Sequence, residues 1–307
     1  RTEHLMRIGV AATPDVAIPT LDWLISSEHQ VDLVITQPDK PAGRGRALKQ
    51  SVVGEWATSR DIPVLKPVTS DELIGKINNL DCVVTIGYGV LLPQHILDLP
   101  KFGFINLHFS LLPAYRGAAP AQRALQNGEV TTGVSVFQLE KGMDTGPIYS
   151  QRTVAIDPKW RSVELLQALA LEGPAAVRDA LTMISQGDSP SSQQGQASLA
   201  PKISKQDAHL DFSNDAKTLV NAIRAFTYEP GAWCTWKNEP FKITSAVVVE
   251  DESVQPAEIV FDGQKVIVGC ENKGTIQLLT VVPAGKKEMS AADWARGARL
   301  QGGDSFD

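Results

Sequence analysis

The first half of the chain alternates short apolar runs with stretches whose apolar residues have helical spacing. The apolar runs occupy residues 7–12, 31–36, 81–86, 102–108 and 133–139. Continuous apolar runs of this length are typical of strands that are buried on both faces. Strands that alternate with helices favour a parallel sheet. We therefore expect an α/β domain with a Rossmann-like, parallel-rich sheet and helices on both faces.

Two apolar stripes at helical spacing follow in residues 160–187, separated by the pair Gly173-Pro174. Because proline has no backbone N–H to donate, we expect the helix to be broken at this pair. The first domain is then expected to span residues 6–187. Residues 188–204 are rich in Ser, Gln and Gly and have little to bury, which predicts a linker.

The remaining residues, 205–307, show a different pattern. One amphipathic helix is expected near the start of this region, beginning at Ser213. After Pro230-Gly231 the apolar residues fall into five short strand-like segments, with turn dipeptides such as Asp262-Gly263 between them. Short strands with one helix predict a small OB-like β-barrel domain at 205–307.

Composition narrows the class of protein. Hydrophobic residues make up 43% of the 307 residues and charged residues 21%, which excludes a disordered or fibrous chain. Three scattered cysteines do not suit a disulfide framework or a CxxC metal site, so we expect a reducing, cytoplasmic location and no metal. No apolar run reaches the ~18 residues of a membrane-spanning helix. The net charge of −6 means that a nucleic acid would need a local basic patch.

The most informative stretch is 103–120, with the sequence GFINLHFSLLPAYRGAAP. Side chains alternate across a strand, so Asn106 and His108 share one face of it. Polar side chains in a buried strand are costly without partners. Because open α/β sheets bind ligands at the carboxyl ends of their strands, this pair marks a candidate site.

A carboxylate follows in residues 140–147, EKGMDTGP, directly after the last of the predicted strands. We expect this segment at the carboxyl edge of the sheet, with Asp144 turned back over it. An amide, an imidazole and a carboxylate together suit acyl transfer, since the imidazole moves a proton and the amide donates to an oxyanion. From spacing alone, a structural hydrogen bond between His108 and Asp144 remains the more common alternative.

The sequence also resembles a known family. INLHFSLLPAYRGAAP together with GMDTG is similar to the folate-dependent formyltransferases, and within them to the branch that acts on methionyl initiator tRNA. The resemblance extends over nearly the whole chain from Met6. Further matching segments are ATPD (12–15), QPDKPAGRGR (37–46), GYGVLLP (87–93) and PAGKKEMSAADWARG (283–297).

The resemblance implies a fold, a reaction and a set of residues. It implies a Rossmann-like catalytic domain joined to an OB-like tRNA-binding domain, with 10-formyltetrahydrofolate as the co-substrate and no metal. Formyl transfer to the amino group of methionine on the initiator tRNA would use Asn106, His108 and Asp144 as catalytic residues. The residues expected to bind the folate are Val90, Leu91, Leu92, Ser110, Leu111, Leu112, Pro113 and Gln138. We expect a monomer.

Basic residues gather in one segment of this acidic chain. Residues 37–49 contain several cations and only one acid, and their Pro and Gly residues argue against regular structure. A basic loop beside the active edge suits phosphate contacts with the acceptor end of a tRNA. The residues predicted to bind tRNA are Lys40, Arg44, Arg46 and Lys49, together with Lys205 and Arg224 of the second domain.

Four other functions fit the sequence less well. A nucleotide-sugar amine formyltransferase or a hydrolase of 10-formyltetrahydrofolate would use the same three catalytic residues. The Arg-Gly-rich segment 37–49 and the residues GAAP at 117–120 argue against both of these functions. A non-catalytic RNA-binding module would have no need of Asn106, His108 and Asp144. A nicotinamide oxidoreductase is disfavoured because RIGVAATPD lacks the GxGxxG pattern after the first strand.

Overall fold

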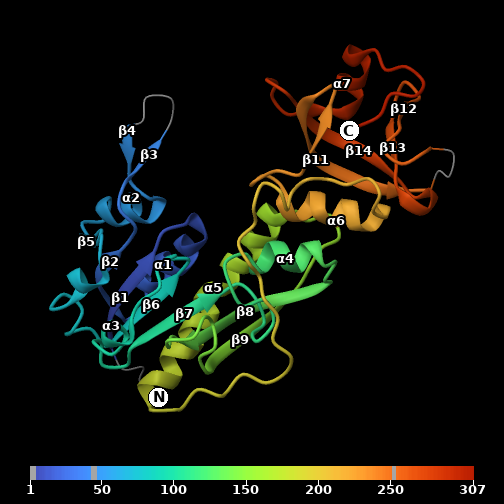
Figure 1. The fold of residues 1–307 in the computed structure, drawn as a ribbon. Helices are drawn as coiled ribbons and strands as arrows, with labels where there is room; N and C mark the ends of the chain where they lie inside the picture. Colours follow the sequence, from blue (N-terminus) through green and yellow to red (C-terminus); the bar gives the residue numbers. More distant parts are fainter. Residues whose placement is uncertain (1–4, 43–46, 251–253) are drawn as a thin grey trace. The chain divides into compact units, whose positions relative to one another are not determined.

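The computed structural model describes residues 5–42, 47–250 and 254–307 (Figure 1). The chain forms two compact units. The first unit contains residues 1–120, 131–155 and 166–201, and the second contains 121–130, 156–165 and 202–307. Two short segments, 121–130 and 156–165, are therefore separated in sequence from the rest of the second unit and interrupt the first unit, a division that the sequence pattern does not predict.

A seven-stranded sheet forms the centre of the first unit, in the order β5-β2-β1-β6-β7-β8-β9. Its strands are β1 (Arg7–Ala12), β2 (Gln30–Ile35), β5 (Val64–Leu65), β6 (Cys82–Ile86), β7 (Phe104–His108), β8 (Thr131–Gln138) and β9 (Ile148–Ala155). The pairs from β5 to β7 are parallel, whereas β8 and β9 add antiparallel strands at one end. The predicted parallel-rich sheet is confirmed.

The apolar runs form strands because both faces of this sheet are covered. All five residues of β6 are buried, and so are the last five of β1. The helices that carry residues of this unit are α1 (Ile18–Ser26), α2 (Val52–Thr58), α3 (Gln94–Leu97), the start of α4 (Pro120–Gln126) and most of α5 (Ser162–Gln186). Buried side chains of α1 and α5 and those of the strands form the core.

The helix expected to break at Gly173-Pro174 is continuous, so that prediction is wrong. Helix α5 runs from Ser162 to Gln186 with Pro174 inside it. A Cβ at Gly173 would lie 2.4 Å from Thr20 Oγ1 and 2.8 Å from a methyl group of Leu107. The glycine therefore allows the helix to pack tightly on its neighbours. Buried apolar residues on both sides of the proline, such as Leu169 and Val177, offset the lost backbone hydrogen bond.

The basic segment also differs from its prediction. Residues expected to lack regular structure contain a short antiparallel pair, β3 (Lys40–Ala42) and β4 (Ala47–Lys49). Proline is compatible with a two-stranded ribbon because such a ribbon consists only of edge strands. Arg44 and Arg46 lie outside the described residues.

The second unit contains an antiparallel sheet in the order β10-β11-β14-β13-β12, with β15 paired to β14. Figure 1 shows this sheet as curled. Its strands are β10 (Trp233–Trp236), β11 (Glu239–Val249), β12 (Ile259–Phe261), β13 (Val266–Gly269), β14 (Thr275–Pro283) and β15 (Met289–Ser290). Helices α6 (Ala216–Phe226) and α7 (Ala291–Ala298) belong to the same unit. Helix α6 is capped by Asp215, which accepts a hydrogen bond from Thr218 N–H, rather than being opened by Ser213.

Candidate active site

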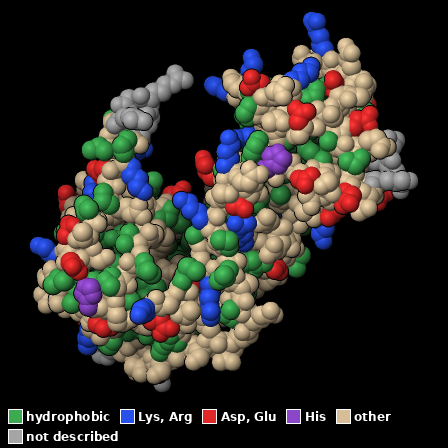
Figure 2. Space-filling model, in the orientation of Figure 1, with side chains coloured by type: hydrophobic (Ala, Val, Ile, Leu, Met, Phe, Trp, Pro, Cys, Tyr) green, Lys and Arg blue, Asp and Glu red, His purple; other side chains and the backbone are tan. Residues whose placement is uncertain are grey.

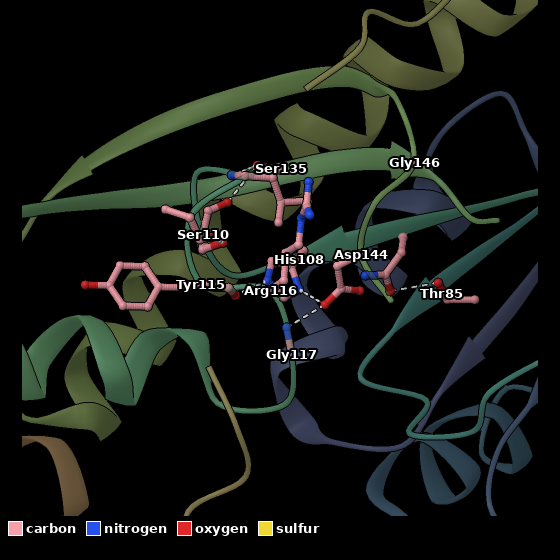
Figure 3. Close-up of polar contacts among 12 residues, drawn as sticks. Thr85, His108, Ser110, Tyr115, Arg116, Gly117, Ser135, Asp144 and Gly146 are labelled. Atoms are coloured by element: carbon pink, nitrogen blue, oxygen red, sulfur yellow. Dashed lines mark hydrogen bonds and ion pairs between the residues drawn. The ribbon is translucent and has the colours of Figure 1, made fainter. Parts of the chain in front are cut away.

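The imidazole of His108 is the centre of the site. It stands on the last residue of β7 and is 6% exposed. Its Nε2 lies 2.8 Å from the carbonyl oxygen of Tyr115. Because a carbonyl only accepts hydrogen bonds, Nε2 carries the hydrogen. In the neutral ring Nδ1 is then left with a free electron pair, and this atom lies 3.7 Å from Asp144 Oδ2 (Figure 3).

The surroundings of His108 favour the neutral ring. Burial lowers the pKa of the imidazole below its usual value of 6.5. The carboxylate of Asp144 and the carbonyl of Tyr115 oppose this effect without outweighing it. At neutral pH the ring is therefore uncharged and able to take up a proton at Nδ1. Once protonated there, it would face the Asp144 carboxylate as an ion pair.

The carbonyl that fixes this tautomer comes from an unusual backbone conformation. Tyr115 has a φ of 61°, in the left-handed region that aromatic residues rarely adopt. Two residues further along the same loop, the backbone N–H of Gly117 donates a hydrogen bond to Asp144 Oδ2 at 2.7 Å. One short loop after β7 thus supplies an acceptor to His108 and a donor to Asp144.

Asp144 reaches the site by a different path from the predicted one. The sequence suggested that its segment leaves a strand at the carboxyl edge of the sheet, and this reason is wrong. Strand β8 is antiparallel to β7, and its end residue Gln138 pairs with Ile105 near the start of β7. The loop after β8 nevertheless carries Asp144 to within 3.7 Å of His108, which stands at the other end of β7. The three predicted polar residues do converge, but a loop rather than a strand end brings the carboxylate there.

The glycines of GMDTG make this return possible. A Cβ at Gly146 would lie 1.8 Å from the backbone carbonyl oxygen of Gln138. Asp144 itself has a φ of 53°, which aspartate tolerates better than most residues. The loop is therefore tightly constrained, and no side chain fits at 146 without moving the backbone.

Asn106 completes the set from the same strand as His108. Its Oδ1 lies 2.8 Å from Thr85 Oγ1, which donates to it from the neighbouring strand β6. With its oxygen occupied, the amide presents its Nδ2 hydrogens as donors. Among the described residues this nitrogen has no hydrogen-bond partner. The arrangement suits an amide that awaits an oxygen of a substrate.

These side chains line a cavity of about 540 Å³ within the first unit. Its wall is largely apolar and includes Val90, Leu91, Leu92, Phe109 and Met143, while Asn106, His108 and Asp144 supply polar groups. Of the predicted folate-binding residues, Val90, Leu91 and Leu92 lie in this wall. A volume of this size and an apolar wall with few polar groups are typical of small-molecule sites.

The other predicted folate-binding residues lie elsewhere. Ser110, Leu111, Leu112 and Pro113 are not among the described residues that line the cavity. The hydroxyl of Ser110 donates to Ala114 O, and Leu112 N–H donates to Ser135 Oγ, so this turn serves to hold the loop after His108. The Gln138 amide donates to Phe102 O and accepts from Tyr149 OH. Backbone and neighbouring side chains therefore occupy these polar groups.

The predicted tRNA-binding cations have varied surroundings. Lys40 donates a hydrogen bond to Gln37 Oε1. The side chain of Lys49 is 63% exposed, and its Nζ lies 4.0 Å from Glu55 Oε1. The ammonium group of Lys205 lies 5.1 Å from the centre of the Trp233 ring. Arg224 is different, because its guanidinium donates to the carbonyl oxygens of Trp160 and Asp157. On the face drawn in Figure 2, basic and acidic side chains are interspersed.

Sequence reasoning missed the groups that orient the three polar residues. These are the Thr85 hydroxyl, the Tyr115 carbonyl, the Gly117 N–H and the side chain of Gln193. Thr85 had a signal, since it is the only polar residue that follows Cys82 in the buried strand β6. A backbone carbonyl or N–H has no signal in the sequence, because every residue type has one.

Within 5–42, 47–250 and 254–307, no helix is both long and apolar enough to cross a membrane. Over the same residues, no group of three or more His, Cys, Asp or Glu side chains is arranged to hold a metal ion.

Comparison with known proteins assigns the class. A family model described as formyl transferase matches residues 6–181, and one described as formyl transferase, C-terminal domain, matches residues 202–299. The chain belongs to the formyl transferase family, as its motifs predicted.

Particular relatives narrow the comparison. A protein of Thermobifida fusca named methionyl-tRNA formyltransferase is 41% identical over 308 residues, which cover 98% of this chain and 99% of the relative. Among solved structures, methionyl-tRNA formyltransferase from Clostridium thermocellum matches with a TM-score of 0.57 and 16% identity, over 79% of this chain and 93% of that one. An N-formyltransferase from Helicobacter canadensis, in complex with folinic acid and dTDP-3-aminofucose, has a TM-score of 0.68 and 17% identity, over 89% and 99%. The two solved structures share the fold.

Proposed function

We propose that this protein transfers the formyl group of 10-formyltetrahydrofolate to the α-amino group of methionyl initiator tRNA. The product is N-formylmethionyl-tRNA, which is used in the cytoplasm to begin translation. The choice of acceptor rests on relatives of that name that match almost the whole chain at about 40% identity. The chemistry rests on one observation, namely that His108 Nδ1 lies 3.7 Å from the Asp144 carboxylate in the wall of an apolar cavity.

Asn106 would stabilise the charge that develops on the formyl oxygen. As the amine nitrogen bonds to the formyl carbon, the carbonyl oxygen becomes an oxyanion and needs a fixed donor. The Asn106 Nδ2 group is available for this, because the Thr85 hydroxyl already occupies the oxygen of the same amide. Positioning of the donor before the reaction avoids the cost of reorienting it as the charge forms.

His108 would carry the proton. The attacking amine gains a positive charge and gives one proton to His108 Nδ1, and Asp144 stabilises the resulting imidazolium. The same proton then passes to N10 of the folate while the bond between N10 and the formyl carbon breaks. Tetrahydrofolate leaves with a neutral N10, the amine has become a formamide, and the imidazole is neutral again. Since burial keeps the resting ring neutral, the amine is the source of the proton.

The apolar wall suits the flat rings of a folate. Val90 and Leu92 lie on the loop after β6, and Phe109 follows His108 directly. Apolar side chains cover ring faces, while backbone N–H and carbonyl groups match the polar edge of a pterin. Folate contacts by Val90, Leu91 and Leu92 are therefore part of the proposal, whereas contacts by Ser110, Leu111, Leu112, Pro113 and Gln138 are not.

The acceptor tRNA would be bound through local cations. The basic segment 37–49 remains our candidate for phosphate contacts, with Lys40 and Lys49 on β3 and β4. Lys205 beside the Trp233 ring is a second candidate, because an aromatic ring next to a cation suits an unpaired base as well as a phosphate. Arg224 is omitted, since backbone carbonyls already engage its guanidinium.

An assay with several acceptors tests the proposal. The purified protein is incubated with radiolabelled 10-formyltetrahydrofolate and either charged initiator tRNA, charged elongator tRNA, a nucleotide-linked amino sugar or no acceptor. We expect label in the methionyl ester of the initiator tRNA, with little in the other samples. Transfer to the sugar would assign the related sugar formyltransferase activity, and release of formate without acceptor would assign a hydrolase. Either result contradicts the proposed acceptor.

A further inference from the structure

Residues 188–201, expected to be a linker with little to bury, are bound along the first unit, and we refer to them as the strap. Near its start Ser191 pairs with Ile148 of β9 through hydrogen bonds of 2.7 and 2.9 Å. Near its end Leu199 forms a bridge with Arg116. Most side chains of the strap are exposed, so polar contacts rather than apolar burial hold it in place.

One side chain of the strap contacts both loops of the active site. The Gln193 amide nitrogen donates to the carbonyl oxygens of Asp144 and Gly146, each at 2.8 Å. Its oxygen accepts from Arg116 Nη2 at 2.7 Å and from Nε at 3.2 Å. Gln193 therefore joins the backbone of the carboxylate loop to a side chain of the loop that follows His108.

The second loop is held by further backbone contacts. Ser198 Oγ accepts from Tyr115 N–H at 2.9 Å, and Ser198 O accepts from Arg116 N–H at 2.9 Å. Ala200 N–H donates to Arg116 O at 2.7 Å. Tyr115 supplies the carbonyl that fixes the His108 tautomer, so the strap holds the partner of His108 as well as the backbone of Asp144.

We infer that the strap is an active-site positioning element, and that Gln193 is the positioning residue that holds Asp144 against His108. The inference rests on the proposed formyl transfer and adds a residue to its machinery. Asp144 stands on a loop rather than on a strand, and its side chain makes a hydrogen bond only to Gly117 N–H among the described residues. The amide of Gln193 supplies the two donors that fix the backbone on either side of Thr145.

Small displacements of such a group have large effects. The separation of 3.7 Å between His108 Nδ1 and Asp144 Oδ2 is already longer than a hydrogen bond. A displacement of about 1 Å in a reacting arrangement costs up to ~10²-fold in rate. We therefore expect loss of the Gln193 contacts to reduce kcat by about ten- to a hundredfold. The KM for the folate donor should change little, because the apolar wall is untouched.

Three variants separate the contacts of this side chain. Gln193→Ala removes both donors and the acceptor. Gln193→Glu keeps an acceptor for Arg116 but places a carboxylate against the two carbonyl oxygens. The control is Gln194→Ala, which alters the neighbouring exposed glutamine, whose amide donates to Ser192 O at 3.5 Å. If the two donors are what positions Asp144, both Gln193 variants lose kcat and the control does not.

A measurement that needs no activity completes the test. The imidazole of His108 is titrated by NMR in each variant, with its signal assigned from the His108→Gln protein. Because Asp144 raises the pKa of this ring, a loosened carboxylate should lower that pKa further. Gln193→Ala with the kcat and the His108 pKa of Gln194→Ala would overturn the inference, as would normal kcat in Gln193→Glu. If the wild type itself formylates no tRNA, the proposed function fails, whereas the NMR titration still decides whether the strap positions the pair.

Discussion

Two parts of one site are built in different ways. Asn106 and His108 stand on β7, a strand buried between β6 and β8, whereas Asp144 stands on the loop between β8 and β9. The strand residues are placed by the sheet and its core. The loop residue is placed by a hydrogen bond from Gly117, by the lack of side chains at two glycines, and by the amide of Gln193.

The difference teaches where such a site is sensitive. A strand in a packed sheet cannot shift without breaking many contacts. The positions of its polar side chains are therefore insensitive to mutations elsewhere, and their function is lost only when these residues are themselves replaced. A loop held by a few polar contacts can shift when any one of those contacts is removed. Mutations of the strand should therefore act through the chemistry of the replaced group, and mutations of the loop through geometry.

The largest effect is expected for His108→Ala. Removal of the proton carrier should lower kcat by about 10²–10⁴-fold, the usual contribution of a general acid–base group. Binding of a folate analogue should persist, because the cavity wall remains. Single-turnover formyl transfer and equilibrium dialysis measure the two quantities. The control is His95→Ala, whose side chain on α3 is 58% exposed. A His108→Ala enzyme within tenfold of wild type would contradict the assignment.

The next effect is expected for Asp144→Asn, which keeps the acceptor for Gly117 N–H but removes the charge. We expect kcat to fall by about 10²-fold, because the imidazolium loses its counter-charge. As the pH falls, kcat decreases because His108 becomes protonated before the reaction. The midpoint of this decrease should lie below pH 6.5 in the wild type and at still lower pH in the variant. The sign follows from burial, which lowers the His108 pKa, and from Asp144, which raises it.

Profiles of kcat against pH for both proteins check this prediction. Asp61→Asn serves as the control, since Asp61 is exposed and its left-handed φ of 56° is tolerated by asparagine. A midpoint that moves to higher pH in Asp144→Asn would show that the carboxylate acts on another group.

Gly146→Ala tests the loop without touching a polar group. Its new Cβ would lie 1.8 Å from Gln138 O, so the backbone beside Asp144 must move. We expect a loss of roughly tenfold or more in kcat, because a displacement of about 1 Å costs up to 10²-fold. Gly302→Ala is the matched control, as nothing lies within 4 Å of its Cβ. Wild-type kcat in Gly146→Ala would show that the loop tolerates displacement.

The smallest effect is expected for Thr85→Val on the strand side. Valine keeps the shape of threonine but loses the hydroxyl that orients the Asn106 amide. Loss of one hydrogen bond of this kind is worth about 1 kcal/mol, or roughly fivefold to tenfold in kcat. Thr85→Ser restores the hydroxyl and should restore most of the rate. If Thr85→Ser is as slow as Thr85→Val, packing rather than the hydrogen bond orients Asn106.

Much of the fold was predictable because its signal is local. The apolar run 7–12 became β1 and the run 81–86 became β6 within one residue, since buried strands need apolar residues on both faces. The pair Asn106 and His108 was also visible, because polar residues stand out in an apolar strand. The break predicted at Gly173-Pro174 failed because the packing of α5 on its neighbours depends on residues distant in sequence.

The amino-acid sequence by itself determined the family, the parallel-rich sheet and the three polar residues, because motifs and hydrophobic periodicity are properties of neighbouring residues. Only the tertiary structure decided that β8 runs against β7, that a loop rather than a strand end brings Asp144 to His108, and that a segment rich in Ser and Gln holds this loop. Strand direction and hydrogen bonds from backbone groups depend on which segments meet in space. Every residue type offers the same backbone N–H or carbonyl, so no pattern of side chains encodes these contacts.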